Sequence, residues 1–361
     1  MDPVSVGLVG CGSISDAYLS NDAFDCYEIV ACGDLDRERA EATAAEYGID
    51  ARPVDDLLSD PAIEAIVNLT PPSVHAQVCT SALEADTHVY TEKPFATTVE
   101  DAREVVDLAA ERDLLVGSAP DTVLGAALQT CRTVVEEGRI GRPIGATAIW
   151  TSPGHEAWHP DPDLYYGEGG GPLFDMGPYY VTALVSLLGP ATRVAGSVGA
   201  ADDERTIGSG PREGESIDVS VPTHESGVVD FDSGAIATLL TSFDVQGSTL
   251  PEPAFELYGT EGTLALPDPN HFDGEVAIHR GGEVEAVEHT HEYVAGRGAG
   301  VADLAYAIRD EGWTHRTSGT LALHVLEALA GIRDSSSEGE HVPIEADLEL
   351  PPALPREFPR S

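Results

Sequence analysis

Lysine is almost absent from this sequence of 361 residues: Lys93 is the single one, and the other 18 basic residues are arginines. These 19 basic residues stand against 63 acidic ones, which gives a formal net charge of −44. A negative field of this size excludes nucleic acid and anionic membranes as partners. Hydrophobic residues still make up 42% of the chain, which argues against disorder. Because molar salt shortens the Debye length to about 3 Å, we expect a protein adapted to high salt, whose surface disfavours lysine.

Long apolar runs and paired cysteines are also missing. No apolar stretch approaches the ~18 residues that span a bilayer, and the N-terminus "MDPVSVGLVG" lacks the charged and apolar segments of an export signal. We therefore expect a cytoplasmic protein without a membrane partner. The cysteines form no C-x-x-C pair, and their scatter is typical of buried thiols in a reducing compartment: Cys11, Cys26, Cys32, Cys79 and Cys131.

The first third of the chain alternates short apolar strands with helical segments. One helix, over about residues 98–112, has a start signal in Thr97 followed three residues later by Glu100. Strand–helix alternation of this kind predicts an α/β fold with a parallel, doubly wound sheet, here a Rossmann domain over residues 1–122. The expected strands are residues 4–10, 27–34, 62–70, 88–94 and 114–120.

The pattern changes in residues 123–361. A helix over 123–141 leads out of the first domain, residues 201–216 have the composition of a long polar loop, and a late helix is expected at 318–332. His324 on that late helix faces either the core or a cleft. The intervening segments alternate with period two around glycine turns, which predicts an α+β domain with an antiparallel sheet. Its hairpins turn at Asp232–Gly234, Gly259–Gly262 and Gly281–Gly282.

The stretch "GLVGCGSIS" joins the first strand to the first helix through glycines. Gly10, Gly12, Ser13 and Ile14 open the helix, and Ser15 occupies the third glycine position of the usual fingerprint. Glycines there allow a tight turn and a close approach of the backbone to a pyrophosphate. The motif indicates dinucleotide binding, and the alternative is an ordinary strand–helix turn.

An acidic residue at the end of the second strand supports that interpretation. Asp34 lies 22 residues after Gly12, where a carboxylate can accept both ribose hydroxyls of NAD and would repel the 2′-phosphate of NADP. Arg37 nearby keeps NADP as an alternative cofactor. If no nucleotide binds, Asp34 is a solvated surface aspartate.

A second glycine-rich motif, "GGGPLFDMGPYY", places Asp175 and Tyr179 four residues apart. On a helix both side chains face the same way and can converge on one hydroxyl. Pro178 must then lie in the first turn of the helix if it is not to break it. The alternative role for Tyr179 is an aromatic residue packed beside Tyr180.

The stretch "HEAWH" satisfies the H-E-x-x-H signature of zinc proteases, from His155 to His159. That chemistry needs a long helix, and the prolines and glycine around the motif leave barely one turn, so we expect no metal. A substrate loop is the better interpretation, with Trp158 stacking on a sugar face and His155, His159 and Asp161 binding hydroxyls. The alternative is a surface loop.

The only lysine lies in "VYTEKPFATT", directly after the fourth expected parallel strand. Together with "GCGSIS" and "GGGPLFDMGPYYVTAL", and more weakly "NLTPPSVH", this stretch resembles the glucose–fructose oxidoreductase/inositol dehydrogenase/MocA family over essentially the whole chain. The resemblance implies a Rossmann domain and an open, mainly antiparallel sheet that forms the substrate floor and a homodimer or homotetramer interface. It further implies that the nicotinamide side is lined by Thr70, Pro71, Pro72, His75, Glu92, Lys93 and Pro94.

In that family the lysine contacts the nicotinamide ribose and a substrate hydroxyl, which the resemblance implies for Lys93. Otherwise Lys93 would cap a helix or lie on the surface. Many members carry histidine where this chain has Tyr179, although glucose–fructose-type relatives carry tyrosine. We therefore expect an NAD(P)-dependent dehydrogenase of a sugar, cyclitol or sugar derivative. Tyr179 would accept the hydroxyl proton, Lys93 would favour its phenolate, and Asp175 would orient substrate and lysine. The alternatives are an NAD-dependent glycoside-cleaving enzyme and a non-catalytic sugar-pathway regulator.

Overall fold

A computed structural model describes residues 2–159, 161–251, 253–291 and 296–358 of the chain. Its contacts divide the chain into two compact units. The N-terminal unit contains residues 1–126, 291–323 and 351–361, and the C-terminal unit contains 127–290 and 324–350. The first break lies close to the predicted boundary at residue 122. The predicted second domain was continuous over 123–361, whereas these contacts group residues 291–323 and 351–361 with the first unit.

The N-terminal unit is built on a six-stranded sheet in which all the pairs are parallel. The order β3-β2-β1-β4-β5-β6 reverses direction between β1 and β4, and ligands of such sheets bind at that reversal, beyond the carboxyl ends of the strands. The predicted Rossmann topology is therefore confirmed. The strands are β1 (Val4–Val9), β2 (Tyr27–Gly33), β3 (Asp50–Ala51), β4 (Ala65–Asn68), β5 (His88–Thr91) and β6 (Val116–Ser118).

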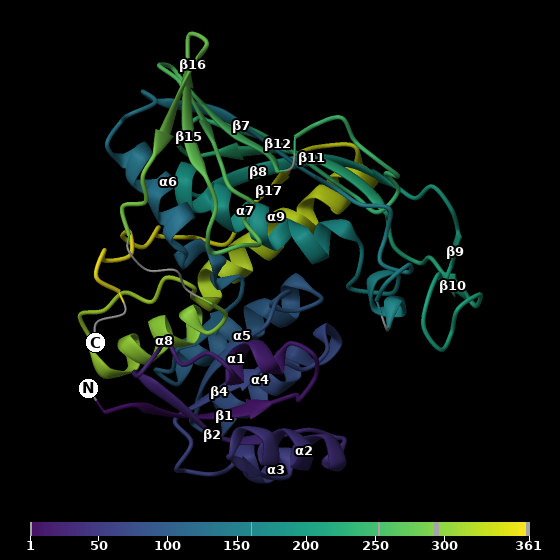
Figure 1. Cartoon of the computed structure of the whole chain (residues 1–361), viewed down its shortest axis with the longest axis vertical. Helices are drawn as coiled ribbons and strands as arrows, with labels where there is room; N and C mark the ends of the chain where they lie inside the picture. Colours follow the sequence, from purple (N-terminus) through teal and green to yellow (C-terminus); the bar gives the residue numbers. More distant parts are fainter. Residues whose placement is uncertain (1, 160, 252, 292–295, 359–361) are drawn as a thin grey trace. The chain divides into compact units, whose positions relative to one another are not determined.

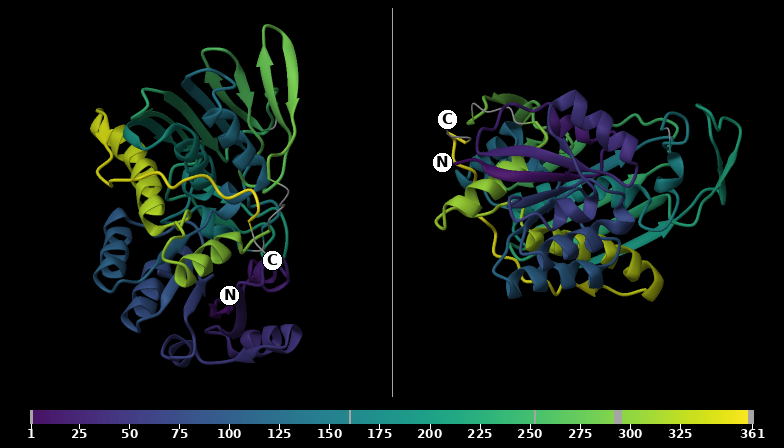
Figure 2. Two further views of the ribbon diagram at one scale, coloured as in Figure 1. Left: turned by 90° about the vertical axis from the view of Figure 1, so that its left-hand side faces the viewer. Right: turned by 90° about the horizontal axis from the view of Figure 1, so that it is seen from below.

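Helices cover this sheet on both sides (Figure 2). The principal ones are α2 (Arg37–Tyr47), α4 (His75–Glu84) and α5 (Val99–Glu111), with the short α1 (Ser15–Leu19) and α3 (Val54–Leu58). Helix α5 begins one residue later than predicted. Its capping side chain is Thr98, which accepts a hydrogen bond of 3.1 Å from the Asp101 N–H, so Thr97 is not the cap.

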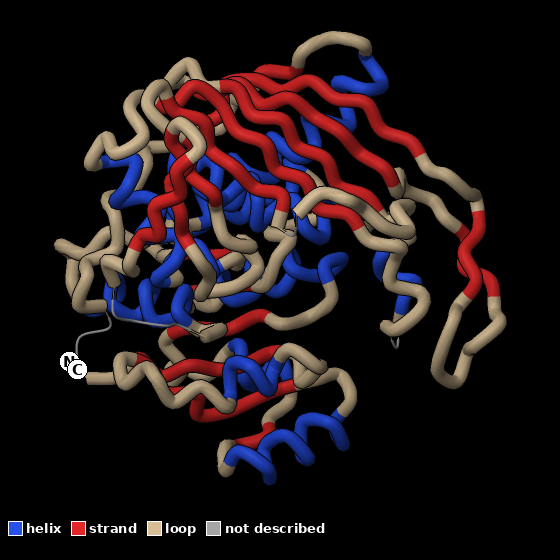
Figure 3. The backbone as a smooth tube through the Cα atoms, turned by 45° about the horizontal axis from the view of Figure 1, so that its top comes forward, coloured by secondary structure: helices blue, strands red, loops and turns tan. Residues whose placement is uncertain are grey.

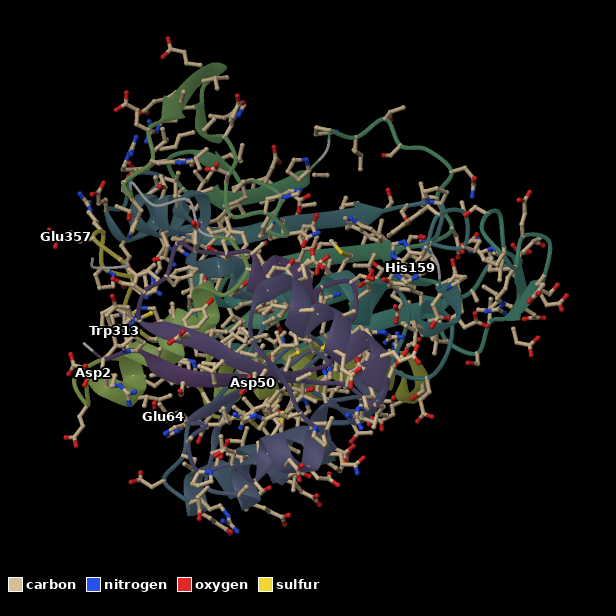
Figure 4. The ribbon with its side chains drawn as sticks, turned by 60° about the horizontal axis from the view of Figure 1, so that its bottom comes forward. Asp2, Asp50, Glu64, His159, Trp313 and Glu357 are labelled. Carbon is tan, nitrogen blue, oxygen red and sulfur yellow. The ribbon has the colours of Figure 1, made fainter. Side chains whose placement is uncertain are left out.

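Two late segments complete the N-terminal unit. Helix α8 (Ala299–Arg309) is held at its start by buried Asp121, whose Oδ2 accepts from the N–H groups of Gly298 (2.9 Å) and Gly300 (3.2 Å). At its other end, Arg309 donates two hydrogen bonds of 2.7 Å to Glu64, which is labelled in Figure 4. These polar contacts join residues more than 170 positions apart in the sequence.

The C-terminal unit is built on a nine-stranded sheet in the order β16-β15-β14-β13-β7-β12-β11-β8-β17. All three predicted hairpins are confirmed, and the pair β7–β12 is the parallel exception. The strands are β7 (Pro143–Thr151), β8 (Ala191–Gly199), β11 (His224–Phe231), β12 (Ile236–Ser242), β13 (Ala254–Gly259), β14 (Thr263–Ala265), β15 (Val276–Arg280), β16 (Glu283–Val287) and β17 (Val342–Pro343).

Helices α6 (Ala126–Glu136), α7 (Pro172–Leu188) and α9 (Gly319–Glu338) accompany this sheet, and α7 packs against β7, β11 and β12 (Figure 1). The predicted polar loop at 201–216 is only partly correct. It contains a small antiparallel ladder of β9 (Glu204–Thr206) and β10 (Ser216–Asp218), and Ile207 and Ile217 beside it are buried. One side of the segment is therefore packed through these two apolar residues, which its overall polar composition did not indicate.

On the opposite face of the nine-stranded sheet, none of the described residues forms a helix (Figure 3). Two rows of side chains cross its centre, Thr147–Thr238–Val228 and Ile149–Leu240–Ser226, as the strand registers align them. All six positions are uncharged and at least partly exposed, and the first row continues on β13 to exposed Glu256, which is paired with Thr147. We call these six residues the open face.

The five cysteines are free and buried, as expected for small apolar side chains. No helix among the described residues is both long and apolar enough to cross a membrane. His324 is buried in the core: its Nε2 accepts from the Ala191 N–H at 2.9 Å and its Nδ1 donates to the Ala346 carbonyl at 2.8 Å. The sequence left His324 facing either the core or a cleft, and the structure places it in the core.

We expect the substitution His324→Gln to make stability less sensitive to acid. Burial lowers the pKa of His324, so below about pH 6.5 the unfolded chain binds a proton that the folded chain does not. The free energy of unfolding consequently falls as the pH drops through that range, and this contribution disappears in the variant. Urea unfolding midpoints of wild type and variant, measured at several pH values in molar KCl, provide the comparison. His279→Gln, at an exposed position of β15, should keep the wild-type slope, and equal slopes for all three proteins would contradict the prediction.

Candidate active site

The glycine turn after β1 lies at the point where the strand order reverses. Gly10 has a φ of +99°, and a Cβ there would lie 2.7 Å from the Leu69 carbonyl group, so only glycine lets this turn pack against the turn after β4. A Cβ on Gly12 would meet no protein atom within 4 Å. Within the described residues, the N–H groups of Gly12, Ser13 and Ile14 have no acceptor. The turn therefore offers open space and backbone donors to an anion.

Asp34 lies beside this turn and helps to shape it. Its Oδ2 accepts from the Cys11 N–H at 2.8 Å and its Oδ1 from the Asp36 N–H at 2.8 Å. The cation nearest to it is Arg39, at 3.6 Å, which the sequence analysis missed. Arg37 instead bonds to Glu41, and its side chain is 88% exposed. Both arginines lie in the first turn of α2, and their spacing alone could not tell which would approach the carboxylate.

The turn after β4 contains Thr70, Pro71 and Pro72, and the short helix η1 (Pro72–Val74) follows. His75 is buried behind it. Its Nδ1 lies 2.7 Å from the Pro94 carbonyl oxygen and its Nε2 lies 2.7 Å from the Thr70 carbonyl oxygen. Burial lowers the pKa of His75. Both ring nitrogens thus contact backbone carbonyl groups, and His75 helps to shape these two turns. The sequence analysis predicted that His75 lines the cofactor.

The turn after β5 carries the predicted Glu92, Lys93 and Pro94, with a cis peptide bond between the last two. Glu92 is buried, and its carboxylate accepts from the Tyr18 hydroxyl at 2.8 Å and from the Lys93 N–H at 3.0 Å. The Lys93 side chain is partly buried. Tyr18 belongs to α1, so this hydrogen bond ties the lysine turn to the helix that follows the glycine turn.

These residues fit a dinucleotide within the N-terminal unit. The open space at Gly12 and the donors of Ser13 and Ile14 suit a pyrophosphate. Asp34 lies at the end of β2, where a ribose is bound in folds of this kind. Lys93 and Thr70 follow neighbouring strands, β5 and β4, at the same sheet edge. The nicotinamide end of a dinucleotide would be held there.

In the C-terminal unit, the "GGG" motif forms the turn that begins α7. Gly171 has a φ of +92°, and a Cβ on Gly170 would lie 2.7 Å from the Tyr165 carbonyl oxygen. Fully buried Glu225 accepts from the Leu173 N–H at 2.9 Å and from Arg333 Nε at 2.6 Å. The turn is therefore fixed by close backbone packing and by one ion pair, and glycine is required where a side chain would collide.

Asp175 and Tyr179 both lie in helix α7, as their spacing predicted. Pro178 also lies within the helix, beyond its first turn, so the expectation that it must occupy the first turn was wrong. The helix is buried along nearly its whole length, and that packing maintains it through the proline. Tyr179 is buried, and the Asp175 side chain is 14% exposed.

His155 contacts Asp175 directly. Its Nε2 lies 2.9 Å from Asp175 Oδ2, and its ring is surrounded by the rings of Trp158 (5.0 Å between centroids), Tyr165 (4.2 Å) and Phe243 (4.7 Å). We call these three aromatic residues the aromatic group. Trp158 is 62% exposed, as a sugar-stacking residue would need to be. The link between His155 and Asp175 was not predicted, because it joins residues of different elements.

The segment "HEAWH" forms a turn, in which the N–H groups of Trp158 (3.2 Å) and His159 (2.9 Å) bond to the His155 carbonyl. The segment is a single turn and not part of a helix, and His159 accepts from the Asp161 N–H at 3.1 Å. Among the described residues no group of three or more metal-ligating side chains could hold a metal ion. His159 is labelled in Figure 4.

Arg205, which the sequence analysis missed, holds this turn in place. It comes from β9 and pairs with Glu156 at 3.2 Å and with Asp244, and all three side chains are nearly buried. Glu156 also accepts from the Tyr166 hydroxyl, which in turn accepts from the His155 N–H at 3.3 Å. Burial, reinforced by Glu156, raises the pKa of Tyr166. The three charged residues are far apart in the sequence, so no local pattern marked them.

Two family models match most of the chain. Residues 4–119 match the family described as "Oxidoreductase family, NAD-binding Rossmann fold", and residues 128–265 match the "GFO/IDH/MocA C-terminal domain". A 1,5-anhydro-D-fructose reductase of Ensifer adhaerens is 32% identical over 245 residues, 66% of this chain and 67% of the relative. A dTDP-3,4-didehydro-2,6-dideoxy-alpha-D-glucose 3-reductase of Saccharopolyspora spinosa is 30% identical over 78% of this chain and 81% of its own.

Solved structures agree as well: levoglucosan dehydrogenase in complex with NADH and levoglucosan superposes with a TM-score of 0.80 at 21% identity, covering 96% of this chain and 100% of that one. The chain belongs to the glucose–fructose oxidoreductase/inositol dehydrogenase/MocA family. It is an NAD-binding, NAD(P)-dependent oxidoreductase that acts on CH–OH groups.

Proposed function

We propose that the enzyme oxidises a hydroxyl group of a sugar, cyclitol or sugar derivative, with Lys93, Asp175 and Tyr179 acting on that hydroxyl. The observation that supports the proposal is that Lys93 follows β5 at the carboxyl edge of the parallel sheet, where such sheets bind ligands, and that Asp175 and Tyr179 share one helix. Sugar oxidoreductases among the relatives give the substrate class. Bound NAD supplies the hydride acceptor.

Residues of the chain accept the proton that leaves the substrate hydroxyl. Tyr179 accepts it, and the ammonium group of Lys93 favours the phenolate form that can do so. Asp175 accepts a hydrogen bond from the substrate and orients it toward the tyrosine. A free tyrosine has a pKa of ~10, so a nearby positive charge is needed for this role near neutral pH. The low exposure of Tyr179 strengthens that charge's effect.

The C-terminal unit has features that suit a sugar ring. A cavity of about 410 Å³ is lined by Trp150 and Tyr180 together with the polar residues Thr151, Asp268 and His271. Pockets for small ligands are of this size and combine aromatic walls with a few polar groups. The Trp150 ring lies 6.2 Å from the His155 ring, which places the cavity next to the aromatic group. Exposed Trp158 supplies a further stacking surface.

A panel of aldoses, cyclitols and anhydrosugars tests the function. The panel is run in molar KCl, because a net charge of −44 repels itself strongly in dilute buffer. NAD and NADP are assayed side by side by the absorbance of the reduced cofactor. Steady reduction with one substrate class supports the proposal. Cleavage of a glycoside without net cofactor reduction would make the enzyme a hydrolase, and binding without any turnover would make it a regulator.

The charge of Asp34 is expected to set the choice of cofactor. We expect Asp34→Asn to raise kcat/KM for NADP relative to NAD by about tenfold, because it removes a carboxylate that repels the 2′-phosphate. The amide oxygen can still accept from the Cys11 N–H, whereas the hydrogen bond from the Asp36 N–H to the other carboxylate oxygen is lost. Parallel assays with both cofactors measure the ratio. An unchanged ratio would show that another group selects the cofactor.

We also propose that the enzyme forms a homodimer or homotetramer through the C-terminal sheet. The open face is uncharged in a chain with 63 acidic residues, which suits burial against a second copy. We expect Thr238→Arg, at the centre of this face, to give monomers in light scattering. Ala110→Arg, at an exposed position of α5, should leave the assembly intact. A wild-type monomer, or a Thr238→Arg oligomer, would refute the proposal.

A further inference from the structure

We infer that His155 is a positioning residue for the reaction: it donates one fixed hydrogen bond that holds the Asp175 carboxylate in its working orientation. This inference rests on the proposed function, in which Asp175 orients the substrate hydroxyl. The first observation is the contact itself, 2.9 Å between His155 Nε2 and Asp175 Oδ2. Both side chains are largely removed from solvent, with exposed fractions of 9% and 14%.

The second observation is the state of the other ring nitrogen. Nδ1 of His155 is buried and has no hydrogen-bond partner among the described residues. A neutral imidazole carries its hydrogen on one nitrogen. On Nδ1 that hydrogen would be a buried donor without an acceptor, which costs about 1–3 kcal/mol. On Nε2 it bonds to a carboxylate. The geometry therefore selects the tautomer that donates to Asp175.

The third observation is that the imidazole cannot easily turn away. It lies edge-on to Trp158 and Tyr165, with interplanar angles of 76° and 73°. The His155 N–H donates to the Tyr166 hydroxyl, which bonds to Glu156, and Arg205 clamps Glu156 from β9. A ring held by aromatic packing and by its own backbone gives a donor of fixed direction.

A fixed donor changes what Asp175 can do. One oxygen is held by His155, so the carboxylate plane is set before a substrate arrives, and a hydroxyl binds without reorganising it. A hydrogen bond to the charged form of a carboxylate also favours that form. Groups that orient a reacting side chain in this way typically change activity by about 10–100-fold when they are lost. The role proposed from sequence, a direct hydrogen bond from His155 to a sugar hydroxyl, is a different one.

Two substitutions separate the positioning role from simple packing. His155→Phe keeps an aromatic ring packed against the aromatic group but cannot donate a hydrogen bond to Asp175. His155→Gln keeps an N–H donor near the position of Nε2. We expect kcat to fall about 10–100-fold in His155→Phe, with KM and NAD affinity within a few-fold of wild type. The acidic limb of its kcat/KM profile should move to higher pH. His155→Gln should recover most of kcat, and His279→Phe, at an exposed position of β15, should match wild type.

The experiment distinguishes failure of the positioning role from failure of the proposed function. If wild type reduces no cofactor with any sugar or cyclitol, the proposed function falls, whatever the variants do. If wild type is active and His155→Phe keeps the wild-type kcat and pH profile, the positioning role is overturned. The role is equally overturned if Phe and Gln variants lose kcat to the same extent, or if the loss lies entirely in KM. Near-ultraviolet circular dichroism and NAD titration establish that each variant is folded.

Discussion

Replacing Lys93 with methionine should lower kcat by at least about 10³-fold while NAD affinity stays within a few-fold of wild type. Methionine retains the length and apolar stem of lysine and removes the charge, so the shape of the turn is kept. The buried carboxylate of Glu92 still accepts from the backbone N–H of residue 93 and from Tyr18. What the proposed mechanism then lacks is the ammonium group assigned to favour the Tyr179 phenolate and to hold the substrate hydroxyl.

The measurement is steady-state reduction of NAD with the best substrate of the panel, together with a fluorescence titration of NAD binding. Arg112→Met is the matched control, because it removes a surface cation of the same unit that pairs with Asp86. It should leave kcat unchanged. A Lys93→Met enzyme with wild-type kcat would remove the lysine from the reaction and with it the proposed mechanism.

The second large effect concerns the turn that begins α7. We expect Glu225→Gln to lower the free energy of unfolding of the C-terminal unit by about 3 kcal/mol, because Arg333 is then left without its buried counter-charge. Glu225 is fully buried, and burial raises its pKa while Arg333 opposes that shift. The carboxylate uses one oxygen for Arg333 Nε and the other for the Leu173 N–H, and a glutamine amide has a single accepting oxygen, so one of these two hydrogen bonds is lost.

Urea unfolding in molar KCl measures this change, and a double-mutant cycle isolates the pair. Adding Arg333→Met to Glu225→Gln should restore part of the lost stability, since the uncompensated charge is removed. Glu41→Gln is the control, because the Arg37–Glu41 pair is exposed and such pairs contribute only about 0–1 kcal/mol. Equal effects of Glu225→Gln and Glu41→Gln would show that burial does not amplify this ion pair.

Features that depend on local sequence could be predicted. Strand–helix alternation gave the parallel sheet, the glycine pairs gave the hairpins, and the four-residue spacing placed Asp175 and Tyr179 on one helix. Asp34 and Lys93 were selected by their positions after strands, and the role predicted for Lys93 came from the family resemblance. Errors at this level were small, such as a capping threonine displaced by one position.

Features that depend on packing between distant segments could not be predicted. Arg205 lies 49 residues from Glu156 and 39 from Asp244, and nothing in its surroundings distinguishes it from other arginines. His155 was selected for its motif, but its contact with Asp175 is set by the fold. His75 was given a cofactor role that its two backbone contacts do not suggest. In each case the tertiary structure determines which residues are in contact. These residues lie too far apart in the sequence for a periodic pattern to reveal the contact.

The late segments of the N-terminal unit bear on the order of events during synthesis. Asp121 is synthesised long before Gly298 and Gly300, and it accepts hydrogen bonds from the N–H groups of both. The separation in the sequence between Glu64 and Arg309 is longer still. The carboxylate of Asp121 is wholly buried in the finished protein and cannot be so before those residues exist. The nascent nucleotide-binding half therefore stays incomplete until translation has passed through strands β7 to β16 of the other half. A fragment ending at residue 126 should accordingly behave as a partly folded species.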